Sequence, residues 1–261
     1  MNRLGAVFQL IRLDSSLLGS IFIFLPLYSR TGDLSLSIKK SIPLLFIYIC
    51  TFIANDLDDF EKDCVNHPNR PLPKKIISPI LAAIFYFISL SITLFSTKLF
   101  IRQEYVFWYY AIMVLAISYH YIIEYLSSLK AIYVATTISL SIFLIANMYP
   151  KEKSLILLGI VSFLFVLGRE LCMDIIDRVG DAPSYWHRLN PRNIAKSSFF
   201  VQIMGLFILP FQFHNIYDIA VIFLMCVFQC IFMWLWLYRN KYKIAIVVMK
   251  IQFFVGAYFL L

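Results

Sequence analysis

The sequence predicts an all-α fold, a polytopic membrane protein built as a bundle of nine transmembrane helices. The 261 residues are 61% hydrophobic with a mean hydropathy of +0.79, whereas a soluble domain has roughly 45–50% apolar residues. Apolar runs of about 18 to 22 residues recur along the chain, each long enough to cross a hydrocarbon core of ~30 Å as a helix. Residues 1–261 are therefore expected to form a single integral membrane domain.

Nine apolar segments are expected to cross the membrane. They lie near residues 6–29, 41–55, 77–97, 105–123, 131–149, 154–173, 197–213, 216–238 and 243–261. These runs are apolar on every face, while a strand of a transmembrane barrel alternates apolar and polar residues, so a barrel is excluded. The first segment is expected to be a span and not a signal peptide, because Arg12 and Asp14 interrupt it and no small-residue cleavage site follows.

The net charge of +8 reflects basic residues in the short loops between apolar segments. This distribution favours membrane topology over nucleic-acid binding, which needs one basic face. With the N-terminus inside, 15 of the 23 Lys and Arg residues lie on the inner side, seven lie on the outer side, and Lys250 lies within the last predicted span. The positive-inside rule then predicts that the two long polar connections, residues 56–76 and 174–196, face the cytoplasm.

Most acidic residues lie in these two connections, which are separated by four predicted spans. An even number of crossings brings both connections to the same membrane face, whatever the orientation of the chain. The five cysteines form no CxxC pair and are expected to be inert core residues. The two acidic connections are therefore predicted to form one site.

The first acidic cluster follows directly on an apolar segment and contains Asp56, Asp59 and Asp63 at offsets 0, 3 and 7. At about 100° per residue these positions fall within roughly 60° of arc, so a continued helix would present them on one stripe. The second cluster repeats this spacing with three further aspartates, Asp174, Asp177 and Asp181. One such stripe is compatible with an ordinary solvated helix end, but two with identical spacing indicate a functional site.

Carboxylates crowded beside hydrocarbon are unfavourable unless cations neutralise them. Mg²⁺ prefers oxygen ligands and completes its coordination with water and substrate phosphate. We therefore predict that the six aspartates are catalytic and bind Mg²⁺ on a diphosphate. Arg70 and Arg169 lie near the clusters in the sequence, and Lys130 ends a short loop on the same predicted side of the membrane. All three are expected to stabilise negative charge on that diphosphate, although each alone is also typical of an interfacial positive charge.

At these residues the chain resembles the UbiA superfamily of intramembrane prenyltransferases. The first family pattern, Asn-Asp-x-x-Asp-x-x-x-Asp, is matched from Asn55 to Asp63. The second, Asp-x-x-Asp-x-x-Gly-Asp, is matched from Asp174 to Asp181. Tyr125 with Lys130 resembles the tyrosine and lysine between helices four and five. The run from Asn69 to Pro73, together with Arg169, Glu170 and the Gly180-Asp181 ending, is most similar to the branch containing homogentisate prenyltransferases and digeranylgeranylglyceryl phosphate synthases.

The resemblance implies a nine-helix bundle whose two Asp-rich cytosolic-side loops bind Mg²⁺ and a prenyl diphosphate, geranyl to geranylgeranyl or longer. It implies diphosphate contacts by Asn55 and Tyr125, besides the three basic residues above. The implied reaction is transfer of the prenyl group to a lipophilic or aromatic acceptor with release of diphosphate. Membrane lipids are expected to surround the protein. Met173 and the stretch 182–191 depart from the branch pattern where an acceptor could approach.

Two alternative functions stay open. An enzyme of the same fold could cyclise the prenyl diphosphate without a second substrate, and it would need the same aspartates. A cation channel or transporter could also bind divalent ions at acidic loops. The sequence disfavours a channel, because the acidic residues lie at one predicted membrane face and no carboxylate lies in the middle of a span to form a path.

Overall fold

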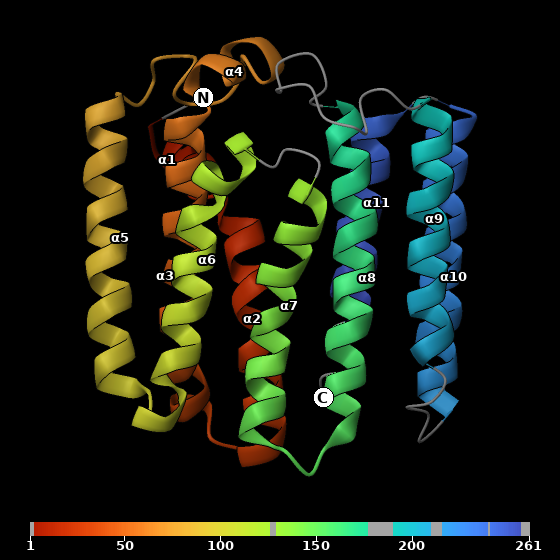
Figure 1. Ribbon diagram of the computed structural model, residues 1–261, viewed down its shortest axis with the longest axis horizontal. Helices are drawn as coiled ribbons and strands as arrows, with labels where there is room; N and C mark the ends of the chain where they lie inside the picture. Colours follow the sequence, from red (N-terminus) through yellow and green to blue (C-terminus); the bar gives the residue numbers. More distant parts are fainter. Residues whose placement is uncertain (1–2, 126–128, 177–189, 210–215, 240, 257–261) are drawn as a thin grey trace. The chain divides into compact units, whose positions relative to one another are not determined.

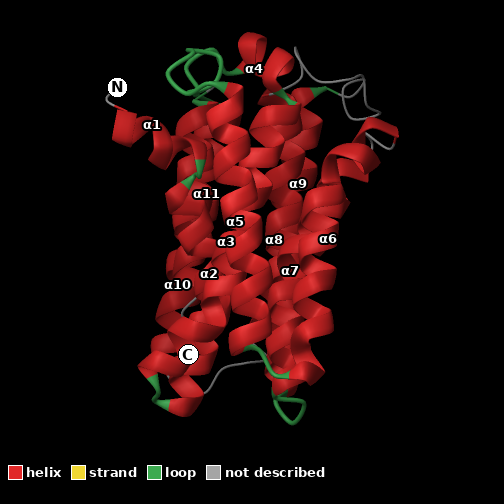
Figure 2. Ribbon diagram, turned by 90° about the vertical axis from the view of Figure 1, so that its left-hand side faces the viewer, coloured by secondary structure: helices red, strands yellow, loops and turns green. Residues whose placement is uncertain are grey.

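The computed structural model describes residues 3–125, 129–176, 190–209, 216–239 and 241–256 (Figure 1). Across these residues the chain forms eleven helices and no strand. Figure 2 draws the described residues as helices joined by loops. The all-α prediction is therefore confirmed. The helices divide into two compact units, the first containing α1 to α6 and the second containing α7 to α11.

The first unit is organised around α3. Its helices are α1 (Arg3–Leu10), α2 (Leu13–Thr31), α3 (Leu34–Asp58), α4 (Phe60–Asn66), α5 (Pro79–Phe100) and α6 (Gln103–Tyr125). Helix α3 packs against α2, α5 and α6. Side-chain oxygens cap the N-termini of α3 and α5. Asp33 accepts a hydrogen bond from the backbone N–H of Leu36, and Ser78 accepts one from that of Leu81. Such caps satisfy N–H groups that have no partner inside the helix.

The first predicted span is divided into α1 and α2, which are bent by 44° at Arg12. Arg12 adopts a left-handed backbone conformation with φ 42°, which is uncommon for a residue with a Cβ atom. In Figure 2, α1 accordingly lies at an angle to the long helices of its unit. The buried Ala6 and Leu10 hold α1 against α3 and the loop before α5.

The second unit is organised around α8 and α10. Its helices are α7 (Lys130–Met148), α8 (Lys153–Ile176), α9 (Pro191–Ile208), α10 (Ile216–Leu237) and α11 (Tyr242–Gly256). Helix α8 packs against α7, α9 and α11, and α10 packs against α9 and α11. The close approach of α7 and α8 depends on a glycine, because a Cβ atom at Gly159 would lie 2.7 Å from the ring of Phe143. Small residues at helix contacts are typical of membrane bundles.

Five helices are long and apolar enough to cross a membrane, and the bent α1–α2 pair is a sixth if it is one span. They are Leu34–Asp58, Pro79–Phe100, Lys130–Met148, Lys153–Ile176 and Tyr217–Leu237. The chain is therefore a multi-pass membrane protein. The remaining helices are less apolar or shorter: α6 contains six tyrosines, α9 begins with several polar residues, and α11 has 15 described residues.

Candidate active site

The first acidic motif lies where α3 gives way to α4. Helix α3 ends at Asp58, and Asp59 (φ −88°, ψ 15°) separates it from the seven residues of α4. Backbone bonding continues through this point, because Asp59 N donates to Asn55 O at 2.9 Å and Asp63 N donates to Asp59 O at 2.7 Å. The motif therefore spans two helices that meet at Asp59. It does not lie on the single continued helix that the spacing of its aspartates predicts.

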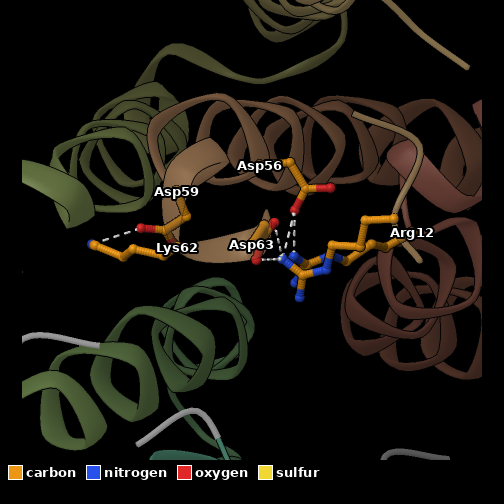
Figure 3. Close-up of polar contacts among 6 residues, drawn as sticks. Arg12, Asp56, Asp59, Lys62 and Asp63 are labelled. Atoms are coloured by element: carbon orange, nitrogen blue, oxygen red, sulfur yellow. Dashed lines mark hydrogen bonds and ion pairs between the residues drawn. The ribbon is translucent and has the colours of Figure 1, made fainter. Parts of the chain in front are cut away.

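Asp56 and Asp63 converge on the same guanidinium group. Arg70 Nη1 lies 2.7 Å and 2.5 Å from the two carboxylate oxygens of Asp63 and 3.3 Å from Asp56 Oδ1. A second arginine, Arg12, places Nη2 2.5 Å from the same Asp56 oxygen (Figure 3). Only 3% of the Asp56 side chain and 5% of the Asp63 side chain are exposed. We call Arg12, Asp56, Asp63 and Arg70 the carboxylate–arginine cluster.

Asp59 lies apart from this cluster. Its carboxylate accepts a bond of 2.8 Å from Lys62 Nζ, and a quarter of its side chain is exposed. Figure 3 shows Asp59 and Lys62 on the opposite side of Asp63 from Arg12. The break in the helix is the reason, since it removes Asp59 from the stripe that continuous helical geometry would give. Of the three aspartates in the first motif, the structure thus brings two together.

Arg70 is held in place by the loop between α4 and α5. Its N–H donates to His67 O at 2.9 Å, and its carbonyl accepts from Lys74 N at 3.1 Å. The side chains of Leu72 and Ile77 are almost fully buried in a cluster with residues of α1, α3 and α5. Because these apolar groups anchor the loop, the arginine is directed to the carboxylates by tertiary packing.

Arg12 is a site residue that the sequence alone indicates only as an interruption of the first span and a positive charge near the membrane. Its guanidinium lies over the ring of Phe52, 4.9 Å from the ring centroid, besides contacting Asp56. A left-handed non-glycine residue has no sequence signature of its own. The available signal was the charged pair Arg12 and Asp14 inside an apolar run, which is where the span is broken.

The cluster balances two buried carboxylates with two guanidinium groups. Burial raises the pKa of the Asp63 carboxyl, and the hydrogen bond and charge of Arg70 act in the opposite direction. Ionised carboxylates removed from water require cationic partners. The convergence of Asp56 and Asp63 on one positive group shows that both can serve a single cation position.

This donor set fits Mg²⁺, which usually takes one or two carboxylates from the protein and obtains its other oxygens from water and phosphate. Within the described ranges, no three His, Cys, Asp or Glu side chains gather as a metal site. The fit therefore rests on the two buried carboxylates of the cluster. Asp177 and Asp181 lie outside the described residues.

The second motif begins near the end of α8. Asp174 is buried, and its Oδ1 atom lies 3.3 Å from Nζ of Lys130, the first residue of α7. The structure thus joins one aspartate of this motif to the lysine predicted to serve the site. Arg169 instead pairs with its neighbour Glu170. Tyr125 is the last residue of α6, and the structure describes its backbone but not its side chain.

The fold and the cluster define a class of protein: a multi-pass helical membrane protein with buried carboxylates and arginines at the ends of its helices. Residues 22–254 match the UbiA prenyltransferase family, and the chain belongs to this family. The resemblance noted at the two acidic motifs is confirmed. The prediction that the protein is a prenyltransferase is confirmed at the level of the family.

Two relatives are similar over much of the chain. The digeranylgeranylglyceryl phosphate synthase of Methanosphaera stadtmanae is 26% identical over 199 residues, covering 71% of this chain and 72% of the relative. The synthase of the same name from Methanocaldococcus jannaschii is 26% identical over 196 residues, covering 69% and 65%.

Solved structures share the fold. A UbiA homologue from Aeropyrum pernix K1 matches with a TM-score of 0.76 at 13% identity, covering 95% of this chain and 97% of that one. A UbiA homologue from Archaeoglobus fulgidus bound to GPP and Mg²⁺ matches with a TM-score of 0.67 at 13% identity, covering 98% and 99%. At these identities, the likeness concerns the fold.

Proposed function

We propose that this chain transfers a prenyl group from an isoprenoid diphosphate to a lipophilic or aromatic acceptor and releases diphosphate, with Mg²⁺ as cofactor. The observation that carries the proposal is the convergence of the buried Asp56 and Asp63 on Arg70 within the first acidic motif. Family membership supports the reaction class. The Archaeoglobus fulgidus homologue bound to GPP and Mg²⁺ supports the donor and the cofactor.

The proposed metal ligands are the aspartates of the two motifs: Asp56, Asp59, Asp63, Asp174, Asp177 and Asp181. When bound, Mg²⁺ supplies positive charge to the diphosphate as it leaves. Arg70 and Lys130 are proposed to contact diphosphate oxygens, because each already faces a motif carboxylate. Asn55, Tyr125 and Arg169 are proposed as further diphosphate contacts on the basis of the family pattern alone.

In the proposed reaction the bond between the allylic carbon and the diphosphate oxygen breaks, and its electron pair leaves with the diphosphate. A nucleophilic carbon or hydroxyl of the acceptor bonds to the allylic cation and then loses a proton. Aromatic rings stabilise such a cation by cation–π contact, by about 2 kcal/mol or more when desolvated. Phe52 is our candidate ring, since it already faces the Arg12 guanidinium.

The acceptor we propose to test first is a prenylated glyceryl phosphate, because two relatives are named digeranylgeranylglyceryl phosphate synthase. Phenolic acceptors come second, in line with the sequence resemblance to homogentisate prenyltransferases. The alternative that shares every proposed metal ligand is cyclisation of the prenyl diphosphate without an acceptor.

We also propose nine membrane spans, with α1 and α2 together as the first, α3 as the second and α5 to α11 as the others. Each of these nine proposed spans overlaps one apolar segment expected from the sequence, which supports the count. The excess of Lys and Arg in alternate loops supports a cytoplasmic position for both acidic motifs.

The test is to incubate membranes containing the protein with labelled geranyl, farnesyl and geranylgeranyl diphosphates. Each donor is supplied with Mg²⁺ or a chelator, and with or without glyceryl phosphate and phenolic acceptors. A lipid product that requires both Mg²⁺ and an acceptor supports transfer. A hydrocarbon or alcohol formed without an acceptor supports cyclisation. Cation flux into liposomes with no turnover of any diphosphate would favour a channel.

A further inference from the structure

Three buried glutamines make polar contacts between helices of the second unit. Gln202 of α9, Gln229 of α10 and Gln252 of α11 are each at most 1% exposed. Gln229 lies near the middle of the candidate span Tyr217–Leu237. Each amide offers both donors and an acceptor, and within a bilayer these groups must find partners inside the protein.

A backbone carbonyl of α8 fixes the orientation of the Gln202 side-chain amide. Phe165 O can only accept, so Gln202 directs its Nε2 toward it, at 3.4 Å. Gln202 Oε1 then accepts from Gln229 Nε2 at 2.6 Å. Gly168 makes room for this contact, because a Cβ atom there would lie 2.6 Å from Gln202 Cγ. The sequence of bonds ends at Gln229 Oε1, a buried acceptor without a hydrogen bond.

A second backbone carbonyl fixes the third glutamine in the same way. Gln252 Nε2 donates to Met225 O at 3.0 Å, which leaves Gln252 Oε1 as another buried acceptor without a hydrogen bond. Met225 and Gln229 are four residues apart on α10, hence on one face. In an α-helix the carbonyl of residue 225 also accepts the N–H of residue 229. The amide of Gln252 therefore reaches the helical turn from which Gln229 projects.

Reversing an amide does not remove the problem. Turning Gln252 would place its carbonyl against Met225 O, and turning Gln229 would place its carbonyl against Gln202 Oε1. Two buried acceptors thus end two polar chains in one region of α10 and α11. Buried polar groups in proteins are almost always hydrogen-bonded, and ordered water is a common partner.

We propose that a single water molecule is bound between α10 and α11 and donates one hydrogen to Gln229 Oε1 and the other to Gln252 Oε1. Water is the smallest neutral molecule with two donor hydrogens. A lipid hydroxyl has only one, and an ammonium group would bring a charge into the middle of the bilayer. With this water in place, polar bonds link α8, α9, α10 and α11 from Phe165 to Gln252. The inference is independent of the proposed transferase reaction.

The direct test is a structure of the detergent-solubilised protein at a resolution that shows ordered water. We expect density for one oxygen within hydrogen-bond distance of both Oε1 atoms. The Gln229→Met variant should lose this density, because methionine has a similar volume but no amide. Absence of the density in the unmodified protein, or a direct bond between the two glutamines, overturns the proposal.

A double-mutant cycle tests whether Gln229 and Gln252 are coupled through the shared water. The apparent unfolding temperature is measured for Gln229→Met, Gln252→Met and the pair. We expect the pair to lose less than the sum of the single losses, because each single change already releases the shared water. Gln103→Met, at the exposed start of α6, is the matched control and should be additive with Gln229→Met. Additive losses for the Gln229 and Gln252 pair would contradict a shared water.

Discussion

Arg70→Gln should destabilise the first unit by leaving two buried carboxylates short of positive charge. Removing one partner of a buried ion pair costs about 3–5 kcal/mol. Arg70 is 21% exposed and Arg12 still contacts Asp56, so we reduce the expected loss to about 2–3 kcal/mol. The cost falls mainly on Asp63, whose described ion pair is with Arg70.

The assay is the apparent unfolding temperature of the purified protein in detergent, with and without Mg²⁺. Arg102→Gln is the matched control, because Arg102 is 75% exposed and its ion pair with Glu104 should contribute at most about 1 kcal/mol. If Mg²⁺ can occupy the cation position between the carboxylates, millimolar Mg²⁺ should recover part of the loss in Arg70→Gln and leave Arg102→Gln unchanged.

Removing the buried charge together with its partner gives an internal check. The combined variant Arg70→Gln and Asp63→Asn should be more stable than Arg70→Gln alone, because no unpaired carboxylate is left at position 63. If Arg70→Gln is no less stable than Arg102→Gln, or if the second change brings no recovery, the electrostatic account of the carboxylate–arginine cluster is wrong.

Three further predictions follow. Asp59→Ala and Asp177→Ala should each lower turnover of prenyl diphosphate by at least about 100-fold while the protein still inserts into membranes; wild-type rates in both would contradict their assignment as metal ligands. Chelation of divalent cations should abolish turnover, and added Mg²⁺ should restore it, so full activity in excess chelator would exclude the proposed cofactor. Gly168→Ala should cost about 1–3 kcal/mol of stability, measured by unfolding temperature, because its Cβ atom would lie 2.6 Å from Gln202; an unchanged temperature would show that α9 shifts freely.

The sequence could predict an all-α, multi-pass membrane protein because hydrocarbon requires long apolar segments, and this requirement is visible in composition alone. It could also identify both acidic motifs, since their spacing is a local property of the chain. It could not predict that Asp59 would separate from Asp56 and Asp63. It could also not predict that Arg70 lies beside the other two carboxylates, because that depends on Leu72 and Ile77 packing against other elements.

Two other features also depend on long-range packing and could not be predicted from the sequence. The ion pair of Arg12 with Asp56 joins residues 44 positions apart. Gln202, Gln229 and Gln252 lie in separate apolar segments, where each looks like an isolated polar substitution. Only the packing of the helices shows that Gln229 bonds to Gln202 and that Gln252 bonds to the backbone of α10. Long-range polar contacts of this kind have no fixed sequence spacing, in contrast to the aspartates, whose offsets of 0, 3 and 7 recur in both motifs.

The break at Asp59 places the two buried carboxylates of the first acidic motif on different helices. Asp56 belongs to a long membrane-spanning helix, whereas Asp63 belongs to the seven-residue α4. Phe60, the first residue of α4, packs against the same apolar cluster as Leu72 and Ile77. The separation of the two carboxylates is therefore set by side chains that are not among the aspartates of either motif and carry no charge.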